Sequence, residues 1–152
     1  MAFSRCEETL LCEVFAVVGA DEGTLWLLDE AQTALVPVWN SGPNAHRIVN
    51  HHRQPLNAGL VSLVCVTGQA ICENGIYRNA GQDPTLDRHL GLLTCAMIAV
   101  PLHFRRAERG VVSCVKLKPA TPSAPDPAPF SAADLARVTA AVRDLERQMD
   151  HR

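Results

Sequence analysis

Apolar residues recur at helical spacing near both ends of this 152-residue chain. Over Glu7–Val18 they recur every three or four positions, which predicts an amphipathic helix that stops at Gly19. A second stripe predicts a helix over residues 131–150, with Ser131 and Asp134 as a box-like start. Its apolar members are Leu135, Val138, Val142, Leu145 and Met149. They form a narrow heptad-like seam, suited either to a partner helix or to the sheet of the same domain.

Four segments between these helices have the composition of β-strands, and turns join them in pairs. Thr24–Leu28 and Ala34–Trp39 flank a polar turn and predict one hairpin. Thr94–Leu102 and Val111–Lys118 flank the charged turn Arg105–Gly110 and predict a second one. Hairpins imply an antiparallel sheet, and helices at both ends imply a packed layer, so the predicted fold class is α+β.

The segment between the hairpins is mixed. Ser41–Asn57 shows no clear period and predicts a loop, with a short strand at His46–Asn50. Gly59–Thr67 is short and apolar, and its flanking residues favour a helix. Gln69–Glu73 predicts a short extended piece, and Pro84–Leu90 predicts a helix with proline at its first position.

Residues 119–129 contain five prolines and predict an extended, poorly ordered surface loop. No repeat or change of composition marks a second domain, so residues 1–152 are expected to form a single domain. The length is sufficient for an ordinary core.

Net charge and hydropathy exclude several kinds of partner. The formal net charge is −2, so there is no overall positive field for nucleic acid or an acidic membrane surface. The longest apolar stretches, Gly59–Val66 and Cys95–Leu102, are far shorter than the roughly 20 residues of a membrane span. No secretory pattern follows Met1. We therefore expect a cytoplasmic location of the bacterial type.

The cysteines and histidines do not predict a metal site. No cysteine pair has C-x-x-C spacing, and reduced, buried thiols are the simplest reading, with a redox role for one or two as the alternative. His46, His51 and His52 could converge on a metal, but adjacent side chains diverge, which favours surface histidines.

Several stretches, in order along the chain, resemble the GAF domain family. Ala20–Asp29, ADEGTLWLLD, is similar to the family's first strand. Leu35–Trp39 is similar to the family's second strand, Pro55–Leu60 to its turn into a short helix, and Thr67–Ala70 to its T-G-x-P/A turn. Further along, Asp83–Asp87 is similar to the D-P-x-x-D segment, Ile98–Leu102 to the L-x-V-P-L strand, and Phe130–Leu135 to the start of the last helix.

The resemblance implies a GAF-like, PAS-related antiparallel sheet of five or six strands. It further implies that the N- and C-terminal helices pack on one face and that a ligand pocket lies on the other, under the Asn74–Gly91 region. GAF domains commonly dimerise through their terminal helices and sense small molecules in signalling proteins.

The chain departs from three specialised branches of the family. Leu117 and Leu135 replace the asparagine and the glutamate of the nucleotide-binding signature, although Lys118, Phe130 and Asp134 fit it. No Cys-His pair is present for bilin attachment, and the sulfoxide reductase cysteine after the G-x-G turn is missing. At that point the chain has Val61 and Ser62.

With the family's layout, nine residues would form the pocket: Trp39, Asn40, Cys72, Asn74, Tyr77, Asp83, Asp87, Cys95 and Met97. A mixture of apolar surface and a few directed polar groups is what a small-molecule site needs. Alternatively, the aromatic residues and Met97 are core, and Asp83 and Asp87 belong to the first turn of a helix. Cys72 and Cys95 are the candidate redox thiols, although Glu73 would raise the pKa of Cys72.

Three functions are compatible with these features. The first is a small-molecule sensor for signal transduction that dimerises through Glu7–Val18 and Ser131–Met149, with its ligand and any cofactor unknown. Its signal would pass to another protein, or the chain is part of a longer one. The second is a thiol-dependent reductase on the same fold, and the third is a ligand-free dimerisation module. No catalytic constellation is recognisable, so we do not expect an enzyme.

Overall fold

The computed structural model describes residues 3–121 and 123–151. Its elements follow in this order: α1 (Arg5–Val17), β1 (Glu22–Leu28), β2 (Ala34–Asn40), α2 (Ala45–Ile48), β3 (Gln54–Pro55), α3 (Leu60–Thr67), β4 (Ile71–Asn74), η1 (Ile76–Arg78), α4 (Thr85–Leu90), β5 (Leu92–Phe104), β6 (Glu108–Pro119) and α5 (Ala132–Asp150). The strands form one sheet in the order β3-β2-β1-β6-β5-β4, and every neighbouring pair is antiparallel.

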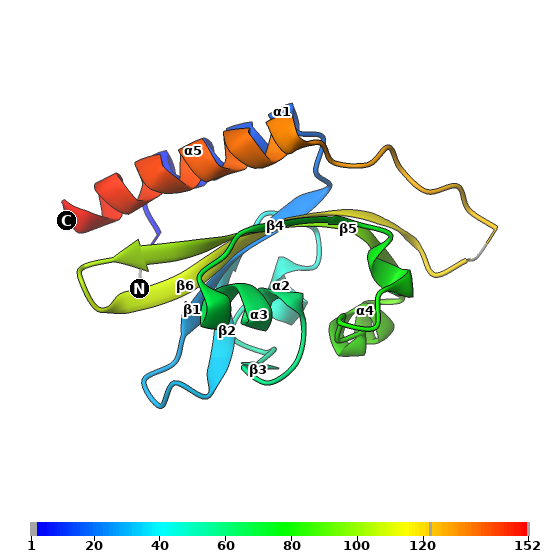
Figure 1. The fold of residues 1–152 in the computed structure, drawn as a ribbon, viewed down its shortest axis with the longest axis horizontal. Helices are drawn as coiled ribbons and strands as arrows, with labels where there is room; N and C mark the ends of the chain where they lie inside the picture. The colour runs from blue at the N-terminus through cyan, green and yellow to red at the C-terminus, as the bar shows by residue number, and fades with distance from the viewer. Residues whose placement is uncertain (1–2, 122, 152) are drawn as a thin grey trace.

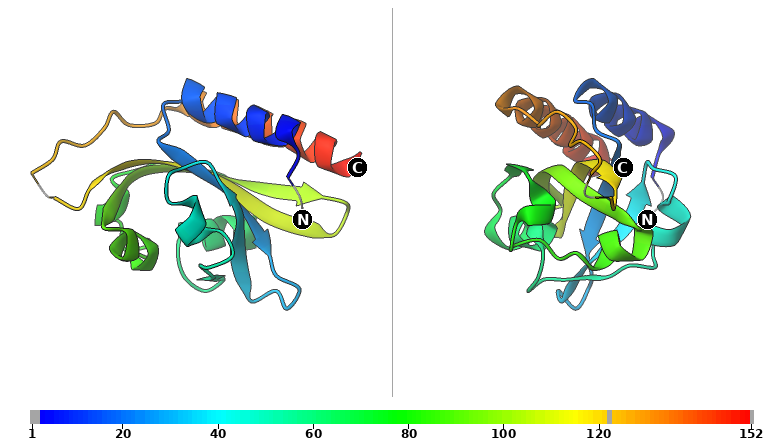
Figure 2. Two further views of the ribbon diagram at one scale, coloured as in Figure 1. Left: turned by 180° about the vertical axis from the view of Figure 1, so that it is seen from behind. Right: turned by 90° about the vertical axis from the view of Figure 1, so that its right-hand side faces the viewer.

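The two terminal helices cover one face of the sheet, and the shorter helices lie on the other. Figure 1 shows α1 and α5 side by side above the sheet, with α2, α3 and α4 below it. The two views of Figure 2 confirm that α1 and α5 run together along the same face. The predicted α+β fold, an antiparallel sheet with its terminal helices on one face, is therefore confirmed.

Alternation along β5 separates the two faces. Ala96, Ile98 and Val100 are buried under α1 and α5, whereas Ala99 packs in a second cluster on the opposite face. Met97 packs against this second cluster. Because successive side chains of a strand point to opposite faces, the near-continuous apolar run of β5 is explained by cover on both sides.

The C-terminal helix begins as predicted and buries its seam within the chain. The Asp134 amide donates to the Ser131 hydroxyl over 3.2 Å, and the Ser131 amide donates to the Asp134 carboxylate over 2.9 Å. Val138 and Leu145 have no exposed surface and pack in the cluster between the helices and the sheet. Of the two readings of the seam, packing on the domain's own sheet and on α1 is the one observed.

The predicted strand at His46–Asn50 is wrong, because that segment contains helix α2. A strand there would bury alternate side chains, but Ile48 is the only fully buried one. A single helical turn is enough to place Ile48 against the sheet. The turn ends at Asn50, whose φ of 60° is left-handed.

Two described parts of the proline-rich segment, at Ala124 and Ala128, contact buried lysines of β6. Lys116 Nζ donates to the Ala128 carbonyl over 2.8 Å, and Lys118 Nζ donates to the Ala124 carbonyl over 3.0 Å. Both lysines are buried, and a buried ammonium needs acceptors. The backbone of the loop supplies them, so the loop lies against the end of the sheet. No helix in the described part of the chain is long and apolar enough to cross a membrane.

Candidate ligand cavity

A cavity lies on the face of the sheet opposite α1 and α5. The space inside it that a water-sized atom can occupy is about 90 Å³. The sheet forms one wall through β1, β5 and β6, and α3, α4 and the segment before α4 form the other. A space of this size has room for several water molecules or for a small organic molecule.

Successive side chains of β1 lie on opposite faces of the sheet, so three of them point into this cavity. Glu22, Thr24 and Trp26 line it, whereas Leu25 packs under the terminal helices. The Trp26 indole N–H donates to the Ser113 hydroxyl of β6 over 2.9 Å, and both side chains are buried. This bond fixes the indole plane in the floor of the cavity.

Two aspartates fasten the α4 region to the rim of the cavity. Asp87 accepts from the Thr94 amide over 2.7 Å and from the Thr94 hydroxyl over 2.9 Å. Asp83 accepts from the Thr85 hydroxyl over 2.6 Å and from the Gln54 amide group over 2.9 Å. The hydrogen bonds from the Thr85 and Gln54 side chains lower the pKa of Asp83 below its ordinary value, so this carboxylate is charged at neutral pH.

Glu22 is the exception among the acidic residues of the cavity. Its side chain is buried, with 8% of the residue exposed, and no described residue donates a hydrogen bond to it or pairs with it. Burial, and next the charges of Asp21 and Asp87, raise the pKa of its carboxyl above the ordinary value. Glu22 also borders a shallower hollow beside Pro43 and Asn44. Lys118 lines that hollow too, but its ammonium is paired with Asp126.

Three of the nine pocket residues predicted from the sequence line this cavity: Asp83, Asp87 and Met97. Asn40 lies directly behind the wall, where its side-chain amide donates to the Thr24 hydroxyl over 2.9 Å. The alternative, that these aspartates belong to the first turn of a helix, also applies to Asp83. Its side chain accepts a hydrogen bond from the Thr85 amide at the start of α4 over 3.1 Å.

Trp39, Cys72 and Asn74 do not line the cavity, which corrects the prediction for them. Trp39 stacks on the rings of Phe3 and Phe15, with centroids 5.5 and 6.3 Å apart, on the side of α1. The Cys72 thiol and the Asn74 amide reach the backbone just before α5. All three sit at strand positions whose side chains face the terminal helices, and the sequence motifs gave no register to reveal this.

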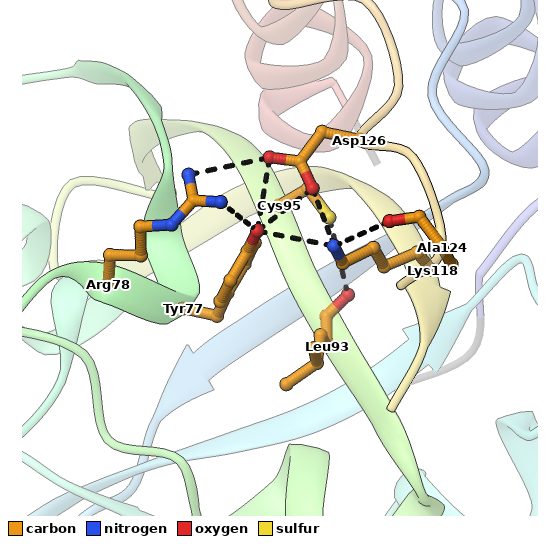
Figure 3. Close-up of polar contacts among 7 residues, drawn as sticks. All are labelled: Tyr77, Arg78, Leu93, Cys95, Lys118, Ala124 and Asp126. Carbon is orange, nitrogen blue, oxygen red and sulfur yellow. Dashed lines mark hydrogen bonds and ion pairs between the residues drawn. The ribbon is translucent and has the colours of Figure 1, made fainter. Parts of the chain in front are cut away.

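Tyr77 and Cys95 lie at a third place, beneath the proline-rich loop, and are also corrected. The Tyr77 hydroxyl donates to Asp126 over 2.9 Å, and Lys118 Nζ donates to the same carboxylate over 2.6 Å (Figure 3). Arg78 pairs with Asp126 as well. Cys95 is the residue at which the register of β5 against β6 shifts, so its side chain leaves the cavity face.

The Asp126 contacts predict a pH-dependent tether of the loop. Hydrogen bonds from Lys118 and Tyr77 lower the pKa of Asp126, and the hydrogen bond to Asp126 raises the pKa of Lys118. The tether is therefore complete between the ordinary pKa values of the two groups. It is lost as the pH falls through the lowered pKa of Asp126 or rises through the raised pKa of Lys118.

Asp126→Asn should speed hydrogen exchange of the Ala124 amide, which donates to Thr121 within the loop. The measurement is amide exchange by NMR at neutral pH. Asp144→Asn, which removes an exposed ion pair with Arg147 on α5, is the matched control. Equal exchange rates at Ala124 in Asp126→Asn and in the wild type would show that the tether does not hold the loop.

The surroundings of Cys72, Cys95 and Cys114 do not activate their thiols. Burial, and next the charge of Asp134, raise the pKa of Cys72, and burial raises the pKa of Cys95. The pKa of Cys114 rises to about 12, mainly through burial. A nucleophilic cysteine needs a lowered pKa. In the described residues no group of three or more histidine, cysteine or acidic side chains could hold a metal ion.

Seven polar or aromatic residues of the cavity wall were not predicted from the sequence: Glu22, Thr24, Trp26, Gln54, Gln82, Thr94 and Ser113. The pattern of residues in β1, the strand with the clearest motif, could have indicated some of them. Within Glu22–Leu28 the residues at alternate positions differ in character, and Glu22 and Thr24 are polar on the face that also holds Trp26.

No protein-family model and no curated protein matches the sequence. Solved structures match its fold. The GAF domain of a phosphoenolpyruvate-protein phosphotransferase from Coxiella burnetii is 17% identical, with a TM-score of 0.74 over 99% of this chain and 85% of that one. The second GAF domain of DevS from Mycobacterium smegmatis is 17% identical, with a TM-score of 0.68 over 94% and 89%.

A third similar structure is the free methionine-R-sulfoxide reductase of Neisseria meningitidis in complex with its substrate. It is 16% identical, with a TM-score of 0.65 over 99% of this chain and 93% of that one. What these three structures share with this chain is the order and packing of the elements described above. This chain has the fold of a GAF domain.

Proposed function

We propose that this domain is a sensor that binds a small molecule in the cavity between the sheet and the α3–α4 side. The observation that carries the proposal is the composition of the cavity wall. Apolar side chains such as Leu60, Leu86 and Met97 surround a few directed polar groups, among them Glu22 and Thr24. A domain of a putative two-component sensor histidine kinase from Sinorhizobium meliloti is among the structural neighbours, which supports a regulatory role for the same fold.

Strand β1 is the element through which occupancy would reach the terminal helices. Its cavity face carries Trp26, and Leu25 packs under α1 and α5. The approach to α1 is close, because a methyl group on Gly23 would lie 2.2 Å from the Phe15 ring. A ligand that shifts β1 therefore changes the packing of α1, and the response is a shift of populations rather than chemistry.

The output would be read on the outer surface of the terminal helices, by a second copy of the chain or by a separate protein. The seam of α5 is occupied within the chain, so a homodimer would use the other side of the helices. Thr9 and Ala16 of α1 and Ala136 and Ala140 of α5 are exposed there. Small side chains allow helices to approach closely.

The test is a thermal-shift screen of metabolites against a cavity-blocked variant. Val115 lines the cavity and is half-buried, so Val115→Phe fills space without replacing a fully enclosed core residue. A ligand that binds the folded state raises the melting temperature of the wild type by mass action. At a hundred times its Kd it adds about 2.7 kcal/mol to the free energy of unfolding.

The matched control is Val17→Phe, which adds the same ring at an α1 position that is 65% exposed. We expect stabilisation in the wild type and in Val17→Phe but not in Val115→Phe. A ligand whose effect persists in Val115→Phe binds elsewhere, and a screen with no stabilising compound supports a ligand-free assembly module instead.

A further inference from the structure

We propose that the cavity takes a small organic ammonium ion, with its N–H groups on the Glu22 carboxylate and its hydrocarbon part against the apolar wall. This inference rests on the proposed function and specifies the chemical class of the ligand. It follows from one unpartnered buried carboxylate, from the charges around it and from the residues that line the cavity.

Glu22 lacks the partner that a buried carboxylate normally has. It is 8% exposed, yet no hydrogen bond or ion pair to its side chain exists within the described residues. Since no fully enclosed side-chain oxygen there is left unpaired, the Glu22 oxygens must still reach the space of the cavity or the adjoining hollow. An acceptor in this position is satisfied by a donor that arrives with the ligand.

The surroundings of Glu22 favour a donor that carries positive charge. Asp83 and Asp87 also line the cavity, and none of the described residues in its wall is a lysine, arginine or histidine. The neighbouring charges that act on the Glu22 carboxyl, Asp21 and Asp87, are both negative. An uncompensated negative field in a site of low dielectric attracts a cation.

The two aspartates do not compete with Glu22 for the ligand in the same way. Both oxygens of Asp87 accept hydrogen bonds from Thr94, and both oxygens of Asp83 accept from Thr85 and Gln54. They contribute charge and hold the rim, while Glu22 offers free acceptor sites. Most of the remaining wall is aliphatic, and the Trp26 ring adds an aromatic face that a cation can approach.

The same wall disfavours two other kinds of ligand. An anion or a zwitterionic amino acid would bring a carboxylate into a cavity whose described wall has no cationic side chain to receive it. A metal ion would need several acidic oxygens at once, and no such group is found among the described residues.

The experiment compares head groups on fixed hydrocarbon skeletons by isothermal titration at pH 7.5. Isopentylamine, isopentanol and isovalerate form one series, and phenethylamine, phenethyl alcohol and hydrocinnamate form another. We expect at least one amine to bind about tenfold or more tightly than its alcohol, the difference a charge-assisted hydrogen bond supplies, and the acid not to bind.

Glu22→Gln keeps the size of the side chain and removes its charge, so it should abolish the preference for the amine over the alcohol. Glu13→Gln, at an exposed position of α1, should leave the preference unchanged. The proposal is overturned if neither amine binds, if alcohol or acid binds as tightly, or if Glu22→Gln keeps the preference. In those cases the Val115→Phe screen still decides whether the cavity is a sensor site.

Discussion

Leu145→Asp unfolds the domain. Leu145 has no exposed surface and lies in the cluster between α5, α1 and the sheet. The substitution removes a buried leucine and places a carboxylate in its position with no cationic partner nearby. These two effects together cost about 5 kcal/mol or more, which is comparable with the whole stability of a small domain. Circular dichroism in a urea titration measures the loss.

Gln148→Asp provides the matched control, because Gln148 is an exposed position of the same helix outside the proposed contact surface. It introduces the same charge, and we expect it to change the free energy of unfolding by less than about 0.5 kcal/mol. If Leu145→Asp instead remained folded with an unchanged urea midpoint, the seam of α5 would not be the internal contact described above. It would then be available to a partner helix.

Gly110→Ala should lower the free energy of unfolding strongly, although it adds only one methyl group. Gly110 lies in β6, where it faces Leu27 of β1 and Leu102 of β5. A methyl group there would lie 2.1 Å from the Trp26 carbonyl oxygen, which is backbone and cannot rotate away. The two central strands must separate, and we expect a loss of about 3 kcal/mol in the free energy of unfolding.

Because Trp26 lies in the wall of the cavity, this loss should be accompanied by weaker binding of any cavity ligand. Gly81→Ala is the control: its methyl group would meet only side chains, that of Asn79 at 3.1 Å and that of Leu60 at 3.6 Å. Thermal melting and ligand titration of both variants test this prediction. Equal stability of Gly110→Ala and the wild type would contradict the close packing of β1 on β6.

The elements of the fold could be predicted from the sequence because local signals and tertiary packing agree in most places. The capping box at Ser131 and the hairpin signals around β1–β2 and β5–β6 act through neighbouring residues. The prediction of secondary structure failed where contacts between residues distant in the sequence determine the local structure. At residues 46–50, where a strand was predicted, the buried side chain of Ile48 belongs to helix α2 instead.

The site was harder to predict because it depends on strand register, which no local motif reveals. A shift by one residue moves a side chain to the opposite face. Trp39 and Cys72 were therefore predicted for the cavity but lie under the helices, whereas Glu22 and Trp26 were overlooked although they belong to the best-recognised strand. Asp83, Asp87 and Met97, which belong to the α4 region and to the centre of β5, do line the cavity.

Methyl NMR of the domain labelled with [methyl-¹³C]methionine tests the central claim most directly. The chain has three methionines: Met97 lines the cavity, Met149 is buried under the terminal helices, and Met1 is at the N-terminus. On titration with a compound that stabilises the domain, the Met97 signal should move and saturate with the binding curve. A Met97 signal that stays unchanged at saturation would contradict the assignment of this cavity as the ligand site.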